Sequence, residues 1–335
     1  MAFKTLSKSE KAYIQSSLQA SSSFRSDGRA LQDYRTVALE TGVVPLANGS
    51  ARINIGKGSD EGGGTEILAA AKLEVEDVEH GDGVEGGRVS CSVSCSPSAY
   101  PFASSGTLDD LQHDYTSLVH SALSHPSLRP ANLSILRGKK SWLLSLDLVV
   151  LSDCGNVYDA LFMAARAAMW DTKVPRTRSV EYRASKNRTG GGTGDMEVDD
   201  EQQSGLDTRQ VKAATDFELE DYWDEGEPLA GRETWPVCIT LNLLPRLHFL
   251  DATSSEEAAI PHRLLLAYSF ASRSTPTLQG MQLLGPGEVD LVHIKALIQE
   301  GEKYASDLYT SLNTKLKDED IRRTDKARLR FAAVR

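Results

Sequence analysis

This chain has little cysteine, no long apolar run and no excess of positive charge. Its four cysteines among 335 residues are too few and too widely spaced for a disulfide framework. No stretch of about 18 apolar residues occurs, so length excludes a membrane span and no membrane partner is expected. Because the first residues form no apolar signal segment, we expect an intracellular, reducing compartment.

Groups of metal-binding side chains are also absent. Cys91 and Cys95 share one face of an alternating segment, but a zinc site needs about four ligands and no Cys or His pair lies at finger spacing. His113, His120 and His125 have no accompanying carboxylate motif. We therefore expect packing or surface roles for these side chains and predict neither a metal nor another cofactor.

The net charge of -10 argues against a protein that grips nucleic acid over its whole surface, since phosphates require clustered Lys and Arg. Residues 184–233 hold fourteen acidic and five basic side chains, so the rest of the chain is almost neutral. This segment includes Gly-rich residues 190–194 and has few large apolar groups, too few to offset its ordering entropy. It is predicted to be a mobile acidic insertion that serves as a partner-docking segment or as a passive spacer.

Hydrophobic periodicity predicts an α+β fold built from two halves, each with strands followed by a helix. A short docking helix is expected after Ser7, a second behind a Thr107 cap, a third over 159–170 and a fourth with an apolar face from Leu291 to Leu312. Strands are expected over residues 51–56, 65–77, 89–95, 141–152, 237–244, 247–251, 264–271 and 277–284. The predicted organisation is a docking segment 1–30, a first half 31–183, the insertion 184–233, a second half 234–314 and a basic tail 315–335. A solvated helix extension is favoured for that tail over an RNA-binding or import segment.

Several short segments follow one another along the chain in a characteristic order. Arg25-Ser26-Asp27-Gly28-Arg29 is followed by Gly49-Ser50-Ala51-Arg52-Ile53, and later segments are 143–151, 153–160, 172–178 and 247–253 with Glu256 and Glu257. Their order and spacing resemble the ribonuclease PH family, most closely its non-catalytic ring subunits in the RNA exosome. The resemblance implies a ribonuclease PH-like fold of the ribosomal protein S5 domain 2-like type. Within it, Arg25, Asp27, Gly28, Arg29, Gly49, Ser50 and Asp147 are structural signature positions.

Active members of the family need a cationic loop for inorganic phosphate and an acid near the scissile linkage, because one anion attacks another. Aligning Gly155 with the loop glycine places Asn156 and Val157 where a hydroxyl residue and an arginine stand in active members. Thr234 falls at the catalytic aspartate, with Glu233 one position away. Residues 96–106 also contain no arginine, although active members hold the RNA backbone near there. We therefore expect no catalytic residues, Val157 and Thr234 being lost positions, and a structural subunit rather than an enzyme.

By this resemblance the partners are other ribonuclease PH-like subunits in a hexameric ring, cap subunits of the S1 and KH type, a hydrolytic exonuclease and RNA in a central channel. The expected locations are nucleus, nucleolus and cytoplasm, and the expected role is support of RNA processing and turnover. Two alternatives stay open: a phosphate-dependent 3'-to-5' exoribonuclease that uses Glu233, and a non-specific RNA-binding module.

Basic side chains supply candidate RNA contacts, although solvated rim charge is the plainer interpretation. Asp147 is expected to make a structural hydrogen bond. Asp27 is expected to pair with Arg25 or Arg29, either to hold the N-terminal segment or to contact a neighbouring subunit. The candidate RNA contacts are Lys139, Lys140, Arg166, Lys173, Arg176 and Arg178.

Overall fold

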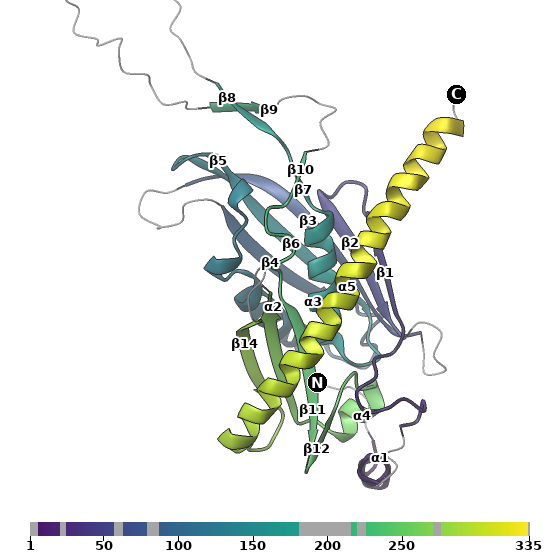
Figure 1. Cartoon of the computed structure of the whole chain (residues 1–335). Coiled ribbons are helices and arrows are strands. Elements are labelled where there is room, and N and C mark those ends of the chain that lie inside the picture. The colour runs from purple at the N-terminus through teal and green to yellow at the C-terminus, as the bar shows by residue number, and fades with distance from the viewer. Residues whose placement is uncertain are drawn as a thin grey trace, which may run out of the picture.

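The first sheet forms one half of the molecule (Figure 1). The computed structural model describes residues 6–20, 25–56, 63–78, 87–180, 216–219, 226–270 and 276–333. The strands pair antiparallel except for the parallel pair β4 and β6. In spatial order they are β1 (Val37–Thr41), β2 (Gly49–Ile55), β3 (Thr65–Asp77), β6 (Lys140–Ser152) and β4 (Arg88–Cys95), with β5 (Ser134–Leu136) beside β6.

A second, fully antiparallel sheet forms the other half. Its spatial order is β12 (Leu247–Phe249), β11 (Val237–Leu244), β13 (Arg263–Ser269) and β14 (Thr277–Leu284). Two small ribbons extend the first half, one of β7 (Lys173–Val174) with β10 (Glu227–Pro228) and one of β8 (Thr177–Val180) with β9 (Asp216–Leu219).

The described residues form the α-helices α1 (Lys8–Gln19), α2 (Ser105–Leu123), α3 (Val157–Asp171), α4 (Ser254–Ala259) and α5 (Leu291–Ala333), and short 3-10 turns cover Pro126–Leu128 and Ala131–Leu133. Almost every residue of α3 is buried, because its many alanines let it pack between the first sheet, β11 and α5. Helix α1 begins with a capping box of Ser7 and Glu10 and docks on α4, where Leu18 is buried. No helix among the described residues is long and apolar enough to cross a membrane.

The α+β class is confirmed, and the predicted strands and helices occur in the predicted order. Strands β1, β5, β7 and β8 and helix α4 have no counterpart in the sequence prediction, and three further details differ from expectation. Helix α2 is capped by Ser104, whose side chain accepts from the Thr107 N–H, so Thr107 lies inside the helix. Helix α5 continues without a break through the predicted boundary at 314, and the described part of the tail is therefore helix. Residues 216–219 and 226–228, assigned to the insertion, form strands β9 and β10. Residues 184–215 and 220–225 lie outside the described part, so mobility there stays a prediction.

Candidate functional site: a closed anion position beside a buried arginine cluster

A buried arginine cluster joins the N-terminal segment to the loop between β12 and α4. We use this name for Arg25, Arg29 and Arg35 with their partners Asp251 and Glu256. Arg25 pairs with Glu256 at 2.7 Å, and its side chain is fully buried. Its guanidinium also donates to the backbone carbonyls of Leu250 and Asp251 at 3.0 and 2.7 Å. A buried charge with this many acceptors stabilises the docking of residues 25–35 on the second half.

Asp251 lies at the centre of this cluster. Arg35 and Arg29 each approach its carboxylate to 2.8 Å, and the Arg35 backbone N–H donates to it at 2.6 Å. Asn156 donates from its side-chain amide at 2.9 Å. Burial alone would raise the pKa of Asp251, but the hydrogen bonds and charges of Arg35 and Arg29 outweigh burial and lower that pKa. The carboxylate is therefore ionised and fully paired.

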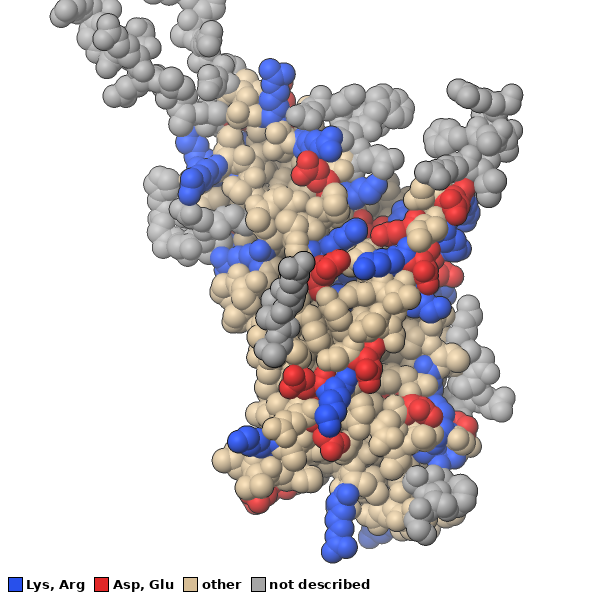
Figure 2. All heavy atoms as spheres, in the orientation of Figure 1, with Lys and Arg blue, Asp and Glu red and all other residues tan. Residues whose placement is uncertain are grey.

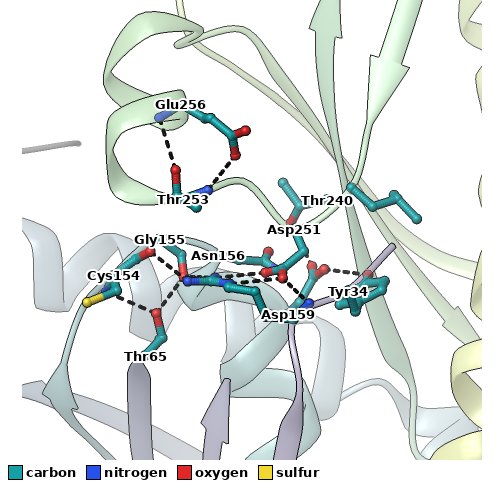
Figure 3. Close-up of polar contacts among 12 residues, drawn as sticks. Tyr34, Thr65, Cys154, Gly155, Asn156, Asp159, Thr240, Asp251, Thr253 and Glu256 are labelled. Atoms are coloured by element: carbon teal, nitrogen blue, oxygen red, sulfur yellow. Dashed lines mark hydrogen bonds and ion pairs between the residues drawn. The ribbon is translucent and has the colours of Figure 1, made fainter. Parts of the chain in front are cut away.

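The loop that was aligned with the family's phosphate loop is closed against the second half (Figure 3). Arg35 donates to the carbonyls of Cys154 and Gly155 at 2.9 and 3.0 Å, and the Thr65 hydroxyl donates to Gly155 at 2.6 Å. Gly155 has φ +91°, and a Cβ there would lie 2.4 Å from the Ala252 carbonyl oxygen. Glycine is thus required both by the backbone conformation and by the close approach of the two segments.

The N-terminus of α3 already holds a carboxylate from the chain itself. The backbone N–H of Asn156 donates to Glu257 Oε1 at 2.8 Å, and the same oxygen pairs with Arg263 at 3.0 Å. Asn156 adopts the left-handed conformation with φ 61° and makes no side-chain cap. Helix N-termini attract anions through their free N–H groups and the helix dipole. Here Glu257 is that anion, and the next residue, Val157, is apolar and 3% exposed.

A second carboxylate, Asp159, is enclosed one turn further along α3. It accepts hydrogen bonds from the Thr240 hydroxyl at 2.7 Å and from the Tyr34 hydroxyl at 2.8 Å (Figure 3). Complete burial raises the pKa of Asp159 to about 7, although these hydrogen bonds oppose the rise. Asp159 lies between the two halves and bonds to both, so its ionisation should affect how they pack together.

The signature residues of segment 25–29 lie in or beside the arginine cluster, whereas Gly49 and Ser50 lie at the start of β2. Asp27 pairs with Arg29 at 2.6 Å, one of the two partners proposed, and Gly28 turns the chain with φ +74°. Gly49 packs against Thr172, where a Cβ would lie 2.4 Å from the hydroxyl oxygen. Ser50 donates from its backbone to Asp171 at 3.0 Å. These two residues seat β2 on the C-terminal end of α3.

Asp147 and Thr234 make local hydrogen bonds. Asp147 accepts from the Ser92 hydroxyl at 2.6 Å on the exposed face of the sheet, which confirms the expected structural bond. Thr234 donates its hydroxyl to the Gly231 carbonyl at 2.8 Å, in a turn that ends before β11 begins. The strand predicted over 237–244 is confirmed, so Glu233 and Thr234 lie before it rather than in it.

One candidate RNA contact is ruled out by burial. Arg166 is 1% exposed and donates to the backbone carbonyls of Trp235 and Glu233 and to Asn313 Oδ1. Its guanidinium also lies 4.6 Å from the Tyr309 ring centroid. Because α3 is covered on all sides, this arginine is a core residue that ties α3 to α5 and to the start of β11.

The other candidates lie at the end of the molecule that carries the small ribbons, where Lys and Arg side chains gather in Figure 2. Lys173, Arg176 and Arg178 are exposed, and Arg176 pairs with Glu227 at 3.2 Å. Lys140 approaches Asp216 to 3.7 Å. Lys139 is half-buried in the neighbouring turn. Five of the six candidates thus share one region.

Sequence reasoning missed the roles of Arg35, Asp159 and Arg263. It also missed that Asn156 bonds to Asp251. Arg35, Asn156 and Asp159 each bond a residue at least 80 positions away, so neither spacing nor periodicity reports the pairing. Arg263 pairs with Glu257, only six positions away. The only signal was indirect, since Asp251, Glu256 and Glu257 belong to a segment that the resemblance had already singled out. Among the described residues, no group of three or more His, Cys, Asp or Glu is placed to hold a metal ion.

The fold is of the ribonuclease PH type. Residues 33–175 match the model of the 3' exoribonuclease family, domain 1. A chain of the structure described as Archaeoglobus fulgidus exosome with RNA bound to the active site has the same fold, with TM-score 0.62, 21% identity and coverage of 90% of this chain and 97% of that one. The predicted ribonuclease PH-like fold is confirmed.

Curated relatives narrow the resemblance to one kind of exosome component. A Dictyostelium discoideum protein named exosome complex exonuclease RRP42 is 26% identical over 309 residues, which cover 77% of this chain and 83% of the relative. The exosome complex component Rrp42 of Thermoplasma volcanium is 31% identical over 174 residues, covering 52% of this chain and 63% of the relative. The chain thus spans less than two thirds of that archaeal relative. It resembles Rrp42 components, as the motifs predicted.

Proposed function

We propose that this chain is a non-catalytic structural subunit of an RNA exosome ring, which supports 3'-to-5' RNA processing and degradation by passing RNA to a separate nuclease. The proposal is supported by the ribonuclease PH-like fold and by similarity to an Rrp42 protein over 77% of the chain. Its neighbours are other ribonuclease PH-like subunits, S1 and KH type cap subunits and the nuclease. Its locations are nucleus, nucleolus and cytoplasm, which imaging of a fluorescently tagged chain tests.

The closed anion position is the observation that carries the non-catalytic part. Phosphorolysis requires inorganic phosphate at the helix N-terminus, but the Glu257 carboxylate already accepts the Asn156 N–H there at 2.8 Å. A phosphate entering beside it would meet a like charge at contact distance, which costs about 4 kcal/mol at an effective dielectric constant of 20. The nearby cations Arg35 and Arg263 are each paired within 3.0 Å and offer no compensation. Catalysis at this position is therefore disfavoured by electrostatics as well as by the missing arginine.

RNA contacts are proposed for the exposed or half-buried basic side chains near the ribbons. Lys139, Lys140, Lys173, Arg176 and Arg178 stand where their charges can reach phosphates without reading sequence. Removing one such contact should reduce the slope of log binding constant against log salt concentration by about one unit. The matched control is Arg166, which is enclosed in the core.

The first experiment is the native mass and composition of the assembly recovered with a tagged copy of the chain from its own cells. A complex with several other ribonuclease PH-like chains is expected. A homo-oligomer would contradict the ring role and would favour the enzyme.

A phosphorolysis assay then separates the two functions directly. The purified chain, supplied with inorganic phosphate and single-stranded RNA, is expected to leave the RNA intact. Phosphate-dependent shortening that is lost in Glu233→Gln would establish the exoribonuclease instead.

A further inference from the structure

The two edges of the first sheet are treated differently. Three alternate N–H groups of edge strand β4 donate to side chains one turn apart on α2, at Gln112, Thr116 and His120, over 3.0 to 3.3 Å. Helix α2 therefore closes that edge with its own side chains. Closing an edge in this way prevents another strand from pairing with it.

The opposite edge, β1, has outward-facing backbone groups. Hydrogen bonds of 2.8 Å from Gly42 to Ser50 and from Gly56 to Thr36 place the even-numbered residues of β1 in bonded pairs with β2. In an antiparallel ladder the alternate residues direct their N–H and C=O away from the partner. At this edge the outward positions are Val37, Leu39 and Thr41.

Helix α5 engages only the last of these positions. Glu319 accepts a hydrogen bond from the Thr41 backbone, and Arg323 donates to the Thr41 hydroxyl at 3.4 Å. Among the described residues, no group bonds to the outward N–H and C=O of Val37 or Leu39. The edge is thus capped at one end and available along the rest.

A groove of about 380 Å³ lies beside the available part of the edge, between β1 and α5. Figure 1 shows α5 passing next to β1. The groove is lined mainly by apolar side chains, with Val37 and Leu39 on one wall and Leu308 and Leu312 on the other. Apolar pockets next to open backbone groups are the features by which sheets take up an extended peptide.

Two unpaired charges mark the α5 rim of the groove. Asp307 and Lys315 both line it, both are exposed, and neither forms an ion pair with a described residue. Their separation of eight helical residues corresponds to about 12 Å along the helix. Two strand residues four positions apart are separated by about 13 Å and point to the same face. The spacing of Asp307 and Lys315 therefore fits an extended strand that has a basic residue, an apolar residue and an acidic residue at three successive alternate positions.

We propose that this groove binds an extended segment of a partner protein, which adds a strand to β1 and inserts an apolar side chain flanked by one basic and one acidic residue. Backbone bonds to Val37 and Leu39 provide the affinity. Asp307 and Lys315 select the flanking charges. The proposal goes beyond the ring role and does not depend on it, because Val37, Leu39, Asp307 and Lys315 take no part in the closed anion position.

The test uses the full chain and fluorescent seven-residue peptides, measured by anisotropy. Each peptide has threonine at odd positions, isoleucine at the fourth, and lysine and glutamate at the second and sixth. Because a strand can add in either direction, both orders of the two charges are used. At least one is expected to bind. Methylating the two peptide N–H groups that point toward β1 is expected to weaken binding of that peptide about thirtyfold, since two hydrogen bonds of about 1 kcal/mol each are lost.

Variants of the groove locate the binding. Asp307→Lys is expected to weaken the lysine and glutamate peptide about threefold and to improve a peptide with glutamate at both charged positions. Asp318→Lys makes the same charge change on α5 outside the groove lining and is expected to have no effect. Leu308→Asp is expected to weaken binding at least about tenfold, with circular dichroism showing that the chain stays folded.

Three results would overturn the proposal. The first is the absence of binding up to millimolar peptide. The second is equal binding of the N-methylated peptide, or an equal effect of Asp307→Lys and Asp318→Lys, because either shows that no strand is added in the groove. The third is self-association of the chain that the peptide inhibits and Leu39→Pro abolishes, which identifies a second copy as the occupant.

Discussion

Replacing Asp251 with asparagine tests whether the arginine cluster holds the two halves together. The substitution keeps the shape of the side chain but removes the charge that pairs with Arg29 and Arg35, each at 2.8 Å. The Asp251 and Arg35 side chains are 0% and 6% exposed, so water cannot compensate for the loss. Breaking a buried pair by removing one partner costs about 3 to 5 kcal/mol. In a chain of 335 residues, about 3 kcal/mol corresponds to a fall in Tm of about 4 °C.

The matched control is Asp27→Asn. Asp27 also pairs with Arg29, at 2.6 Å, but its side chain is 29% exposed. A pair of this kind contributes about 1 kcal/mol or less. Thermal unfolding of wild type and both variants, followed by circular dichroism, compares the two losses. Equal falls in Tm would refute the reasoning, because they would show that the central carboxylate stabilises no more than a surface pair.

The pH dependence of the same comparison has a definite sign. The folded-state pKa of Asp251 is lowered, with burial opposed and outweighed by Arg35 and Arg29. Its stabilisation is therefore complete above the unfolded value of about 3.9 and is lost as the pH falls through the folded pKa. The difference in Tm between wild type and Asp251→Asn should be constant from about pH 5 to 7 and should shrink in stronger acid.

Three further predictions concern single positions. Asp159 has its pKa raised to about 7, mainly by burial, so the wild type should lose stability as the pH rises from about 4 to 7, and Asp159→Asn should abolish that slope in thermal scans. Gly155→Ala should cost more than about 2 kcal/mol in denaturant unfolding, because of positive φ and the 2.4 Å approach to Ala252, whereas Gly28→Ala, with no atom within 4 Å, should cost about 1 kcal/mol. Arg166→Lys should lower Tm by about 4 °C or more and leave the salt dependence of RNA binding unchanged, because the lost contacts are in the core.

Much of the fold was predictable because strands and helices leave periodic patterns in the sequence. The alternation of Val89, Cys91, Val93 and Cys95 marks β4, and the alanines of 160–168 mark a helix that packs closely. Capping was less predictable. Ser104 and Thr107 are both good caps three residues apart, and the choice between them depends on where the preceding loop enters α2.

The site was far less accessible from the sequence. Arg166 looked like a surface cation because it is charged, yet the sheets and α5 enclose it and supply carbonyl acceptors from distant residues. Likewise Asp251 and Arg35 are 216 residues apart, and their pairing depends on how the two halves dock. Local patterns describe elements, while charge pairing of this kind depends on tertiary structure.

Glu257 provides a direct test of the closed anion position. In Glu257→Ala the Asn156 N–H and the Arg263 guanidinium lose the acceptor they share at 2.8 and 3.0 Å, and the variant should unfold at lower temperature in chloride. The vacated position then has a helix N-terminus and a buried arginine, which together attract inorganic phosphate. At a hundredfold excess over its Kd, phosphate should restore about 2.7 kcal/mol.

The comparison is between phosphate and chloride at equal ionic strength, in wild type and in Glu257→Ala. Wild type should show no specific gain, because its own carboxylate already fills the position. If phosphate stabilised both proteins equally, the anion position would be open in the native chain. The electrostatic argument against phosphorolysis would then fail, even if the chain still assembled into a ring.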